Sequence, residues 1–109
     1  MIKTISREEI RARLESGEQM VLVEALPKPY FEDWHLPGAV NIPHDEVYSR
    51  APEMLPDRNA FIVVYCASTE CRNSKIAADT LRQMGYTNTH EYVEGKRHWR
   101  ENDLPVESS

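Results

Sequence analysis

The sequence predicts an α/β protein in which a mostly parallel sheet is covered by helices on both faces. Short, apolar, β-branched segments bounded by turn residues recur along the chain, and the strongest are 20–25 (MVLVEA) and 61–65 (FIVVY). Runs of this kind, apolar on both faces, are typical of buried parallel strands. Segments with helical spacing lie between them, and this alternation of strand and helix predicts the α/β class.

The elements in the first half follow from capping and turn residues. Ser6 and Glu9 have the spacing of a capping box, and Gly17 is placed to end the helix that they begin. Pro52 and Pro56 are expected to break regular structure where they stand. The predicted elements are, in order, a helix over 6–16, a strand over 20–25, one helical turn over 30–34, a strand over 40–42, and a short helix and loop over 45–55.

The second half repeats the alternation. Ile76, Ala77, Leu81 and Met84 have helical spacing, and Gly85 follows them as a stop signal. The predicted elements are a strand over 61–65, a helix over 72–84, a strand over 89–93, and a last helix that opens at residue 95 and ends near residue 102.

Length and composition restrict the function classes. We predict a single domain spanning 1–109, with a polar tail from about residue 104. The formal net charge of −5 argues against a nucleic-acid partner, since such proteins usually present a basic face. No apolar stretch approaches membrane-spanning length, and residues 1–6 lack the apolar segment of a secretory signal. We therefore predict a cytoplasmic protein without a membrane partner, the alternative being a secreted form whose signal has been trimmed.

The segment after strand 61–65 carries the candidate chemistry. Cys66 stands directly at the end of this strand, where α/β sheets bind ligands. A loop then leads to a helix that begins near Arg72, whose unpaired amides and dipole favour an anion. Such a placement can lower a cysteine pKa from about 8.5 towards roughly 3.5–7.5, and Arg72 adds a planar cation. We refer to residues 66–72 as the Cys66 loop.

A cysteine at a strand end also has a second interpretation. Cysteine is among the most frequently buried residue types, so Cys66 at such a position is often a packing residue. The helix and Arg72 that follow favour a nucleophile. From these residues alone, both interpretations stay open.

Four separated segments have the motifs of a known family. They are VLVEAL at 21–26, HLPGAVNIP at 35–43, IVVYCASTECRNS at 62–74, and Gly95 to Trp99 followed by Leu104-Pro105. In this order and combination, which covers nearly the whole chain, they resemble the rhodanese family. The resemblance implies an α/β rhodanese-like fold with a five-stranded, mostly parallel sheet and helices on both faces.

The same resemblance implies an activity and a site. It implies a sulfurtransferase of the thiosulfate:cyanide type, in which Cys66 takes a sulfane sulfur from thiosulfate or a related small anion and becomes a persulfide. The sulfur then passes to cyanide, a low-molecular-weight thiol or a protein, and neither a metal nor an organic cofactor is required. Loop amides and the guanidinium would hold the departing oxyanion. The implied substrate-binding residues are Ala67, Ser68, Thr69, Glu70, Cys71 and Arg72.

The chain departs from the family pattern at three places, one of which is Glu94-Gly95, where a double glycine is usual. The usual aspartate and arginine of the first strand motif are Glu24 and Leu26, so an ion pair common in the family is absent or remade. The usual C-x4-R loop is C-x5-R here, which resembles rhodanese-fold phosphatases and arsenate reductases. Those enzymes usually have histidine before the cysteine, whereas this chain has Tyr65. We favour sulfur transfer over phosphate or arsenate chemistry, and a non-catalytic interaction module of the same fold is the third alternative.

Other polar residues have weaker claims. Cys71 is either a resolving or relay thiol for Cys66 or a small residue packed under the loop, and we favour packing. The four histidines and two cysteines show no zinc spacing, so no metal site is expected. Ser74 is expected to cap or line the first helical turn after the loop. Lys96 and Arg97 are expected either to make the site mouth positive or to form a solvated face.

Overall fold

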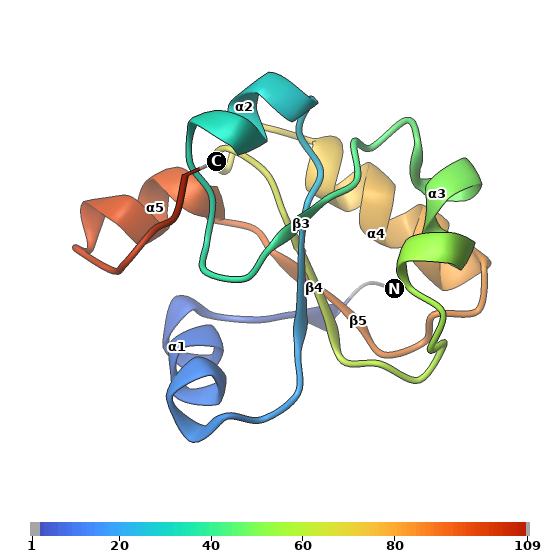
Figure 1. The fold of residues 1–109 in the computed structure, drawn as a ribbon, viewed down its shortest axis with the longest axis horizontal. Coiled ribbons are helices and arrows are strands. Elements are labelled where there is room, and N and C mark those ends of the chain that lie inside the picture. The colour runs from blue at the N-terminus through green and yellow to red at the C-terminus, as the bar shows by residue number, and fades with distance from the viewer. Residues whose placement is uncertain (1–2, 109) are drawn as a thin grey trace.

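Five strands form one sheet in the computed structural model, which describes residues 3–108 (Figure 1). Their order across the sheet is β1-β5-β4-β2-β3, and every neighbouring pair is parallel. The predicted α/β class and its parallel sheet are therefore confirmed. The strands are β1 (Lys3–Thr4), β2 (Val21–Glu24), β3 (Val40–Asn41), β4 (Ile62–Tyr65) and β5 (Thr89–Tyr92).

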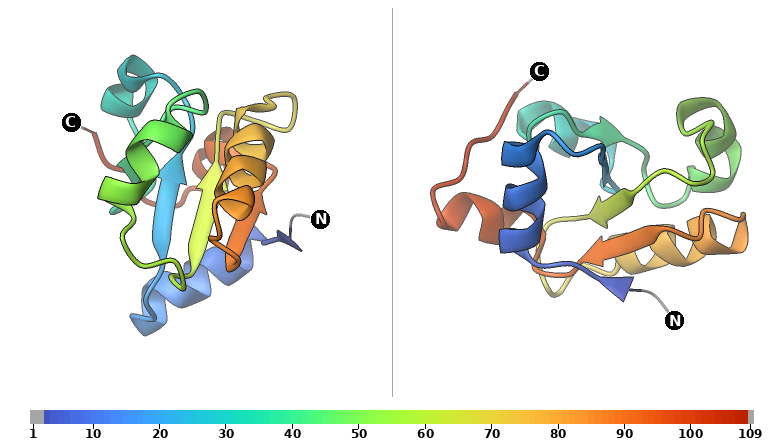
Figure 2. Two further views of the ribbon diagram at one scale, coloured as in Figure 1. Left: turned by 90° about the vertical axis from the view of Figure 1, so that its right-hand side faces the viewer. Right: turned by 90° about the horizontal axis from the view of Figure 1, so that it is seen from below.

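Helices cover both faces of this sheet (Figure 2). The side chains of β4 alternate between two cores: Ile62 and Val64 pack with α3 and α4, whereas Val63 and Tyr65 pack with residues of α1 and α5. None of the described helices is long and apolar enough to cross a membrane. The helices are α1 (Arg7–Ser16), α2 (Lys28–Asp33), α3 (Val47–Met54), α4 (Asn73–Gln83) and α5 (Gly95–Glu101).

The caps predicted for the first helix are present. The Ser6 Oγ accepts a hydrogen bond from the Glu9 amide at 3.1 Å, and the Glu9 carboxylate accepts one from the Ser6 amide at 3.2 Å. These reciprocal bonds satisfy two amides that a helix start leaves unpaired. Gly17 has the left-handed conformation that commonly ends a helix, with φ of 74°.

The register of the central strands places the functional edge of the sheet. Glu24, Tyr65 and Tyr92 are register partners at the carboxyl ends of β2, β4 and β5. Because the strands are parallel, the residues that follow them all emerge at one edge. Cys66 follows Tyr65 and lies at this edge, which is the usual ligand-binding side of an open α/β sheet.

Three local features differ from the sequence-based expectation. The strand β1 was not predicted, because it has only two residues, both exposed, and pairs with the edge of β5. Pro52 lies inside α3 rather than ending it, and the helix continues to Met54. A proline inside a helix lacks one backbone donor and usually kinks or ends it, and here α3 ends two residues later. Ile76 was expected to face the core but is 46% exposed on α4.

The polar tail is held against the rest of the chain. The amide of His35 donates to the carbonyl of Glu107, and the reverse bond is also formed, each at 2.8 Å. Leu104 packs against the core, and the Trp99 indole donates to the Pro105 carbonyl at 2.8 Å. The sequence predicted the polarity of this segment but not these long-range bonds.

Candidate functional site

The Cys66 thiol lies between the end of β4 and the first turn of α4. Its side chain is buried, with 1% of the residue exposed. The thiol has two acceptors, the Ser74 Oγ at 3.3 Å and the Cys71 carbonyl oxygen at 3.4 Å. The predicted placement of Cys66 at the start of a helix is therefore present.

The acidity of this thiol differs from the expectation. The pKa of Cys66 is raised to about 11, mainly because burial disfavours the thiolate and further because of a hydrogen bond with the Cys71 thiol. Hydrogen bonds with the Ser74 side chain and backbone lower the pKa of Cys66 but are smaller effects. The prediction of a lowered pKa is wrong for this conformation, since burial outweighs the helix N-terminus.

A hydrogen-bond chain connects this thiol to a carboxylate that the sequence analysis missed. The buried Ser74 hydroxyl accepts from Cys66 and donates to the Glu91 Oε2 at 2.7 Å. Glu91 is half-buried on β5, the strand beside β4. The sole sequence signal for it was an acidic residue within a predicted strand, near the edge where Cys66 emerges. The chain of donors offers a route for the thiol proton to a carboxylate.

Most amides of the Cys66 loop have no acceptor within the described protein. Within residues 3–108, the amides of Ala67, Ser68, Thr69, Glu70 and Arg72 donate to no protein acceptor. The Cys71 amide does not belong to this set, because it donates to the Ser68 carbonyl at 3.1 Å and closes a turn. The expected cradle of six amides thus has five unpaired donors.

The predicted side chains of the loop face solvent to different degrees. Thr69, Glu70 and Arg72 are exposed, whereas Ser68 and Cys71 are half-buried. Arg72 occupies the N-cap of α4 and forms no ion pair with a described carboxylate. The arrangement therefore leaves this guanidinium free to meet an incoming anion. Within the described residues, no three His, Cys, Asp or Glu side chains gather as a metal site.

Backbone amides at the start of α5 hydrogen-bond to carbonyl groups of the Cys66 loop. The Lys96 amide donates to the Cys66 carbonyl at 2.9 Å, and the Arg97 amide donates to the Ala67 carbonyl at 3.0 Å. Gly95 has φ of 78°, and a Cβ at this position would come within 2.7 Å of the backbone of Cys66, Ala67 and Ser68. Glycine is required here for the close approach of two backbones.

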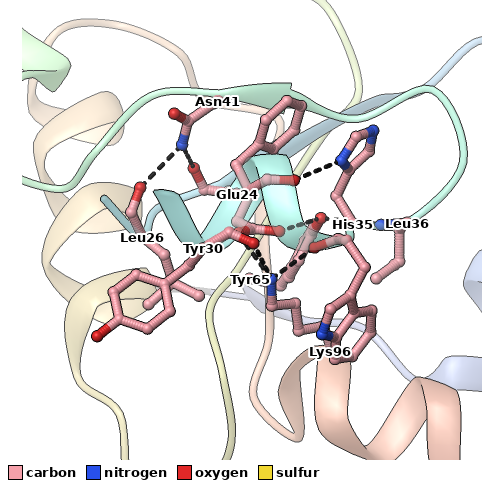
Figure 3. Close-up of polar contacts among 10 residues, drawn as sticks. Glu24, Leu26, Tyr30, His35, Leu36, Asn41, Tyr65 and Lys96 are labelled. Atoms are coloured by element: carbon pink, nitrogen blue, oxygen red, sulfur yellow. Dashed lines mark hydrogen bonds and ion pairs between the residues drawn. The ribbon is translucent and has the colours of Figure 1, made fainter. Parts of the chain in front are cut away.

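Next to the loop lies a buried polar group, which we term the Lys96 cluster (Figure 3). It comprises the side chains of Glu24, Tyr65 and Lys96 with the carbonyl oxygens of Tyr30 and Trp34. The Lys96 ammonium donates to the Glu24 Oε2 at 3.0 Å, to the Tyr30 carbonyl at 2.9 Å and to the Trp34 carbonyl at 2.6 Å. The Tyr65 hydroxyl donates to the Glu24 Oε1 at 2.9 Å.

This cluster corrects the expectation for Lys96. The side chain was expected in a charged rim or solvated face, but Lys96 is 5% exposed and Glu24 is fully buried. Burial raises the pKa of Glu24, while the hydrogen bond and charge of Lys96 oppose that rise. The family motif has an arginine at position 26, where this chain has the uncharged Leu26. Here the cation that pairs with Glu24 is Lys96. The ion pair left open by the sequence is therefore remade from α5.

The fold and the thiol together define a class, an α/β protein with a buried cysteine at the carboxyl edge of a parallel sheet. The family model described as the rhodanese-like domain matches residues 6–102. The chain therefore belongs to the rhodanese-like family, which confirms the resemblance and the predicted fold.

Three similar proteins illustrate the range of this family. The chain is 35% identical over 103 residues to the HTH-type transcriptional regulator Rv0324 of Mycobacterium tuberculosis, covering 94% of this chain and 44% of that protein. It is 33% identical over 98 residues to the putative sulfur carrier protein YrkF of Bacillus subtilis, covering 90% and 51%. The structure of the human single-domain sulfurtransferase TSTD1 matches with a TM-score of 0.81 and 26% identity, covering 93% and 97%. The chain spans about half the length of these two curated relatives.

Proposed function

We propose that this chain is a sulfurtransferase in which Cys66 carries the transferred sulfur as a persulfide. The observation that carries the proposal is the buried Cys66 thiol, hydrogen-bonded to Ser74, which is itself hydrogen-bonded to Glu91. Similarity to a protein named as a putative sulfur carrier and to a human single-domain sulfurtransferase supports it.

The first half-reaction forms the persulfide. The Cys66 proton passes to the Ser74 oxygen while the Ser74 proton passes to the Glu91 carboxylate, which acts as the base. The thiolate attacks the outer sulfur of thiosulfate or a related anion, and the donor's sulfur–sulfur bond breaks. Sulfite leaves with the electron pair of that bond. The unpaired amides of the Cys66 loop and Arg72 stabilise the charge on the departing group.

The second half-reaction returns the thiolate. A nucleophilic acceptor, such as cyanide, a low-molecular-weight thiol or a protein thiol, attacks the outer sulfur of the persulfide. The sulfur–sulfur bond breaks, and its electron pair stays on Cys66. No electron is left over in either step, so neither a metal nor an organic cofactor is needed.

The C-x5-R spacing supports a second candidate function, hydrolysis of a phosphate ester or reduction of arsenate. A wide loop with a fixed arginine suits a tetrahedral oxyanion. Tyr65 disfavours this candidate, because rhodanese-fold phosphatases and arsenate reductases usually have histidine at that position before the cysteine. The Cys71 amide, which donates to the Ser68 carbonyl, is also not free to bind a tetrahedral oxyanion.

A single-turnover measurement of sulfite tests the proposal. The reduced chain, freed of reductant and mixed with thiosulfate, is expected to release one equivalent of sulfite per chain. Rapid quenching with an alkylating reagent is expected to trap a persulfide on Cys66. Cys66→Ser, the matched control, is expected to release none.

Two results would contradict the proposed function. One is the absence of a sulfite burst from the folded wild-type chain, which would favour a non-catalytic interaction module. The other is steady hydrolysis of p-nitrophenyl phosphate that disappears in Cys66→Ser and Arg72→Ala, which would favour phosphate chemistry.

A further inference from the structure

The second cysteine lies against the first. The Cys66 thiol donates to the Cys71 carbonyl oxygen at 3.4 Å, so the loop turns back to bring these residues together. The Cys71 amide fixes this turn by donating to the Ser68 carbonyl at 3.1 Å. Both cysteines are free thiols, and Cys71 is half-buried while Cys66 is buried. Of the two cysteines, Cys71 is therefore the one more accessible to reagents in solution.

The Cys71 side chain also influences the pKa of Cys66. A hydrogen bond between the Cys66 and Cys71 thiols contributes to the raised pKa of Cys66, together with the mutual repulsion of their charged forms. The backbone of Cys66 is held at its carbonyl by the Lys96 amide, and that of Cys71 is held at its amide.

We propose that Cys71 is an internal acceptor that releases the sulfur from Cys66 as hydrosulfide. This inference rests on the proposed function, since it begins from the Cys66 persulfide. It assigns the chain a further activity, the reduction of sulfane sulfur to sulfide. The substrate class is any small anion that can charge Cys66, with thiosulfate as the probe.

The position of Cys71 next to the Cys66 Sγ determines which of the two persulfide sulfurs is attacked. In a persulfide, the inner sulfur is the Sγ of Cys66, which occupies the place of the resting thiol beside Cys71. The Cys71 sulfur attacks this inner sulfur and forms the Cys66–Cys71 disulfide, and the Cys71 thiol proton passes to the outer sulfur. The bond between the inner and outer sulfur breaks, and the outer sulfur leaves with the electron pair as hydrosulfide. The two thiol sulfurs are oxidised and the sulfane sulfur is reduced, so the electrons balance.

Further turnover needs an external reductant of the dithiol class. A dithiol reduces the Cys66–Cys71 disulfide by exchange, which proceeds through a mixed disulfide and returns both thiols. The half-buried Cys71 sulfur is the more accessible point of attack for such a reductant. Without a reductant, one chain releases one hydrosulfide and stops.

The test compares the wild-type chain with Cys71→Ser in single turnover. Serine is close to cysteine in size, and both backbone bonds of residue 71 are kept. Each protein is reduced, freed of reductant under anaerobic conditions and mixed with thiosulfate, and sulfite, hydrosulfide and intact mass are measured. A parallel sample without thiosulfate controls for oxidation by residual air.

The wild-type chain is expected to yield one equivalent each of sulfite and hydrosulfide and to lose the mass of two hydrogens. Peptide mapping is expected to locate the Cys66–Cys71 disulfide, and dithiothreitol to permit a second round. Cys71→Ser is expected to release sulfite without hydrosulfide and to gain the mass of one sulfur.

Other outcomes overturn the inference. Equal hydrosulfide from Cys71→Ser, a stable persulfide on wild-type Cys66, or transfer of the sulfur onto Cys71 would each remove Cys71 from the proposed role. Sulfite without hydrosulfide in the wild type rejects this inference and leaves the proposed function in place. Absence of sulfite from both proteins rejects the proposed function itself.

Discussion

The Cys66 loop and the Lys96 cluster lie side by side at the carboxyl edge of the sheet, but they are built in opposite ways. The loop is a continuous, partly exposed segment whose amides mostly lack protein partners. The cluster joins residues far apart in the sequence and is buried, and each of its charged groups is paired. They meet in Lys96, whose amide holds the Cys66 carbonyl and whose side chain holds Glu24. In the proposed function, the unpaired donors bind the incoming anion, whereas the paired donors of the cluster fix the position of the loop.

The completeness of the cluster explains how it tolerates burial. An ammonium group has three donors, and Lys96 uses all three. Its charge also lies over the Trp34 ring, 4.6 Å from the centroid. Such saturation is needed because a buried charge left without partners is strongly destabilising.

Breaking this cluster is expected to have the largest effect on the fold. Lys96→Met leaves the Glu24 charge buried without its cation and is expected to lower the free energy of unfolding by about 3–5 kcal/mol. Urea unfolding followed by circular dichroism measures this change. The matched control is Lys75→Met, which removes the exposed Lys75–Asp79 pair on α4 and is expected to lose only about 0.3–0.5 kcal/mol.

A double variant sharpens the interpretation of that loss. Glu24→Gln combined with Lys96→Met removes the unpaired charge and is expected to be more stable than Lys96→Met alone. If Lys96→Met costs no more than the exposed Lys75→Met, the cluster does not fix the fold in the way argued above.

The second largest effect is expected from a substitution at Gly95, where the backbone of α5 approaches that of the Cys66 loop. Gly95→Ala drives a methyl group into the loop backbone, and a shift of about 1 Å in a reacting group can reduce rates by about 10²-fold. The initial rate of sulfite release measures this effect. Gly17→Ala is the control, because Gly17 has a similar φ of 74° but nothing within 4 Å of an added Cβ. Equal sulfite rates in the two variants would show that the loop does not depend on this contact.

The sequence predicted the loop better than the cluster, for a physical reason. The chemistry of the loop is encoded locally: a buried strand, a cysteine and a helix start are neighbours in the chain, so Cys66 and the loop amides were found. The cluster depends on contacts between segments that only the fold brings together. Glu24 was recognised as a departure from the family motif, but its partner Lys96 was assigned to the surface.

The same limit applies to Glu91 and to the acidity of Cys66. A carboxylate in a short strand carries no signal of which loop it will meet, so the bond from Ser74 to Glu91 was not predictable. The helix start argued for a lowered pKa of Cys66, but the depth of burial that raises it is a property of the packed fold. Spacing predicted which groups would be neighbours, and the fold determined the balance of their effects.

Removal of the Glu91 carboxylate is expected to have a smaller effect, confined to the reaction rate. Direct general bases contribute about 10²–10⁴-fold, and we expect about 10-fold at pH 8 for Glu91→Gln because the proton passes through Ser74. Glu94→Gln, which removes a nearby exposed carboxylate, is the control. The measurement is the rate of sulfite release by stopped flow.

The pH dependence of the same rate separates the base from a structural role. With a Cys66 pKa of about 11, the Glu91→Gln variant relies on thiolate formed by solvent, so its rate is expected to rise steadily from pH 7 towards 11. The wild-type chain is expected to be less dependent on pH. A constant ratio of the two rates at every pH would argue against proton transfer to Glu91.

The smallest expected effect is a change in the pH dependence of folding stability caused by His90, which belongs neither to the Cys66 loop nor to the Lys96 cluster. Burial, with the nearby charges of Lys3 and Arg13, lowers the pKa of His90. Its ring stacks on Phe61 at 4.2 Å between centroids and contacts the Ile62 carbonyl at 3.3 Å.

Because the folded state favours neutral His90, its contribution to stability is complete above the unfolded pKa of about 6.5 and is lost as the pH falls through the lower folded value. Urea unfolding at pH 8 and pH 5 is expected to show a smaller decrease in stability for His90→Gln than for the wild-type chain. If both proteins lose the same stability between pH 8 and pH 5, a group other than His90 causes the pH dependence.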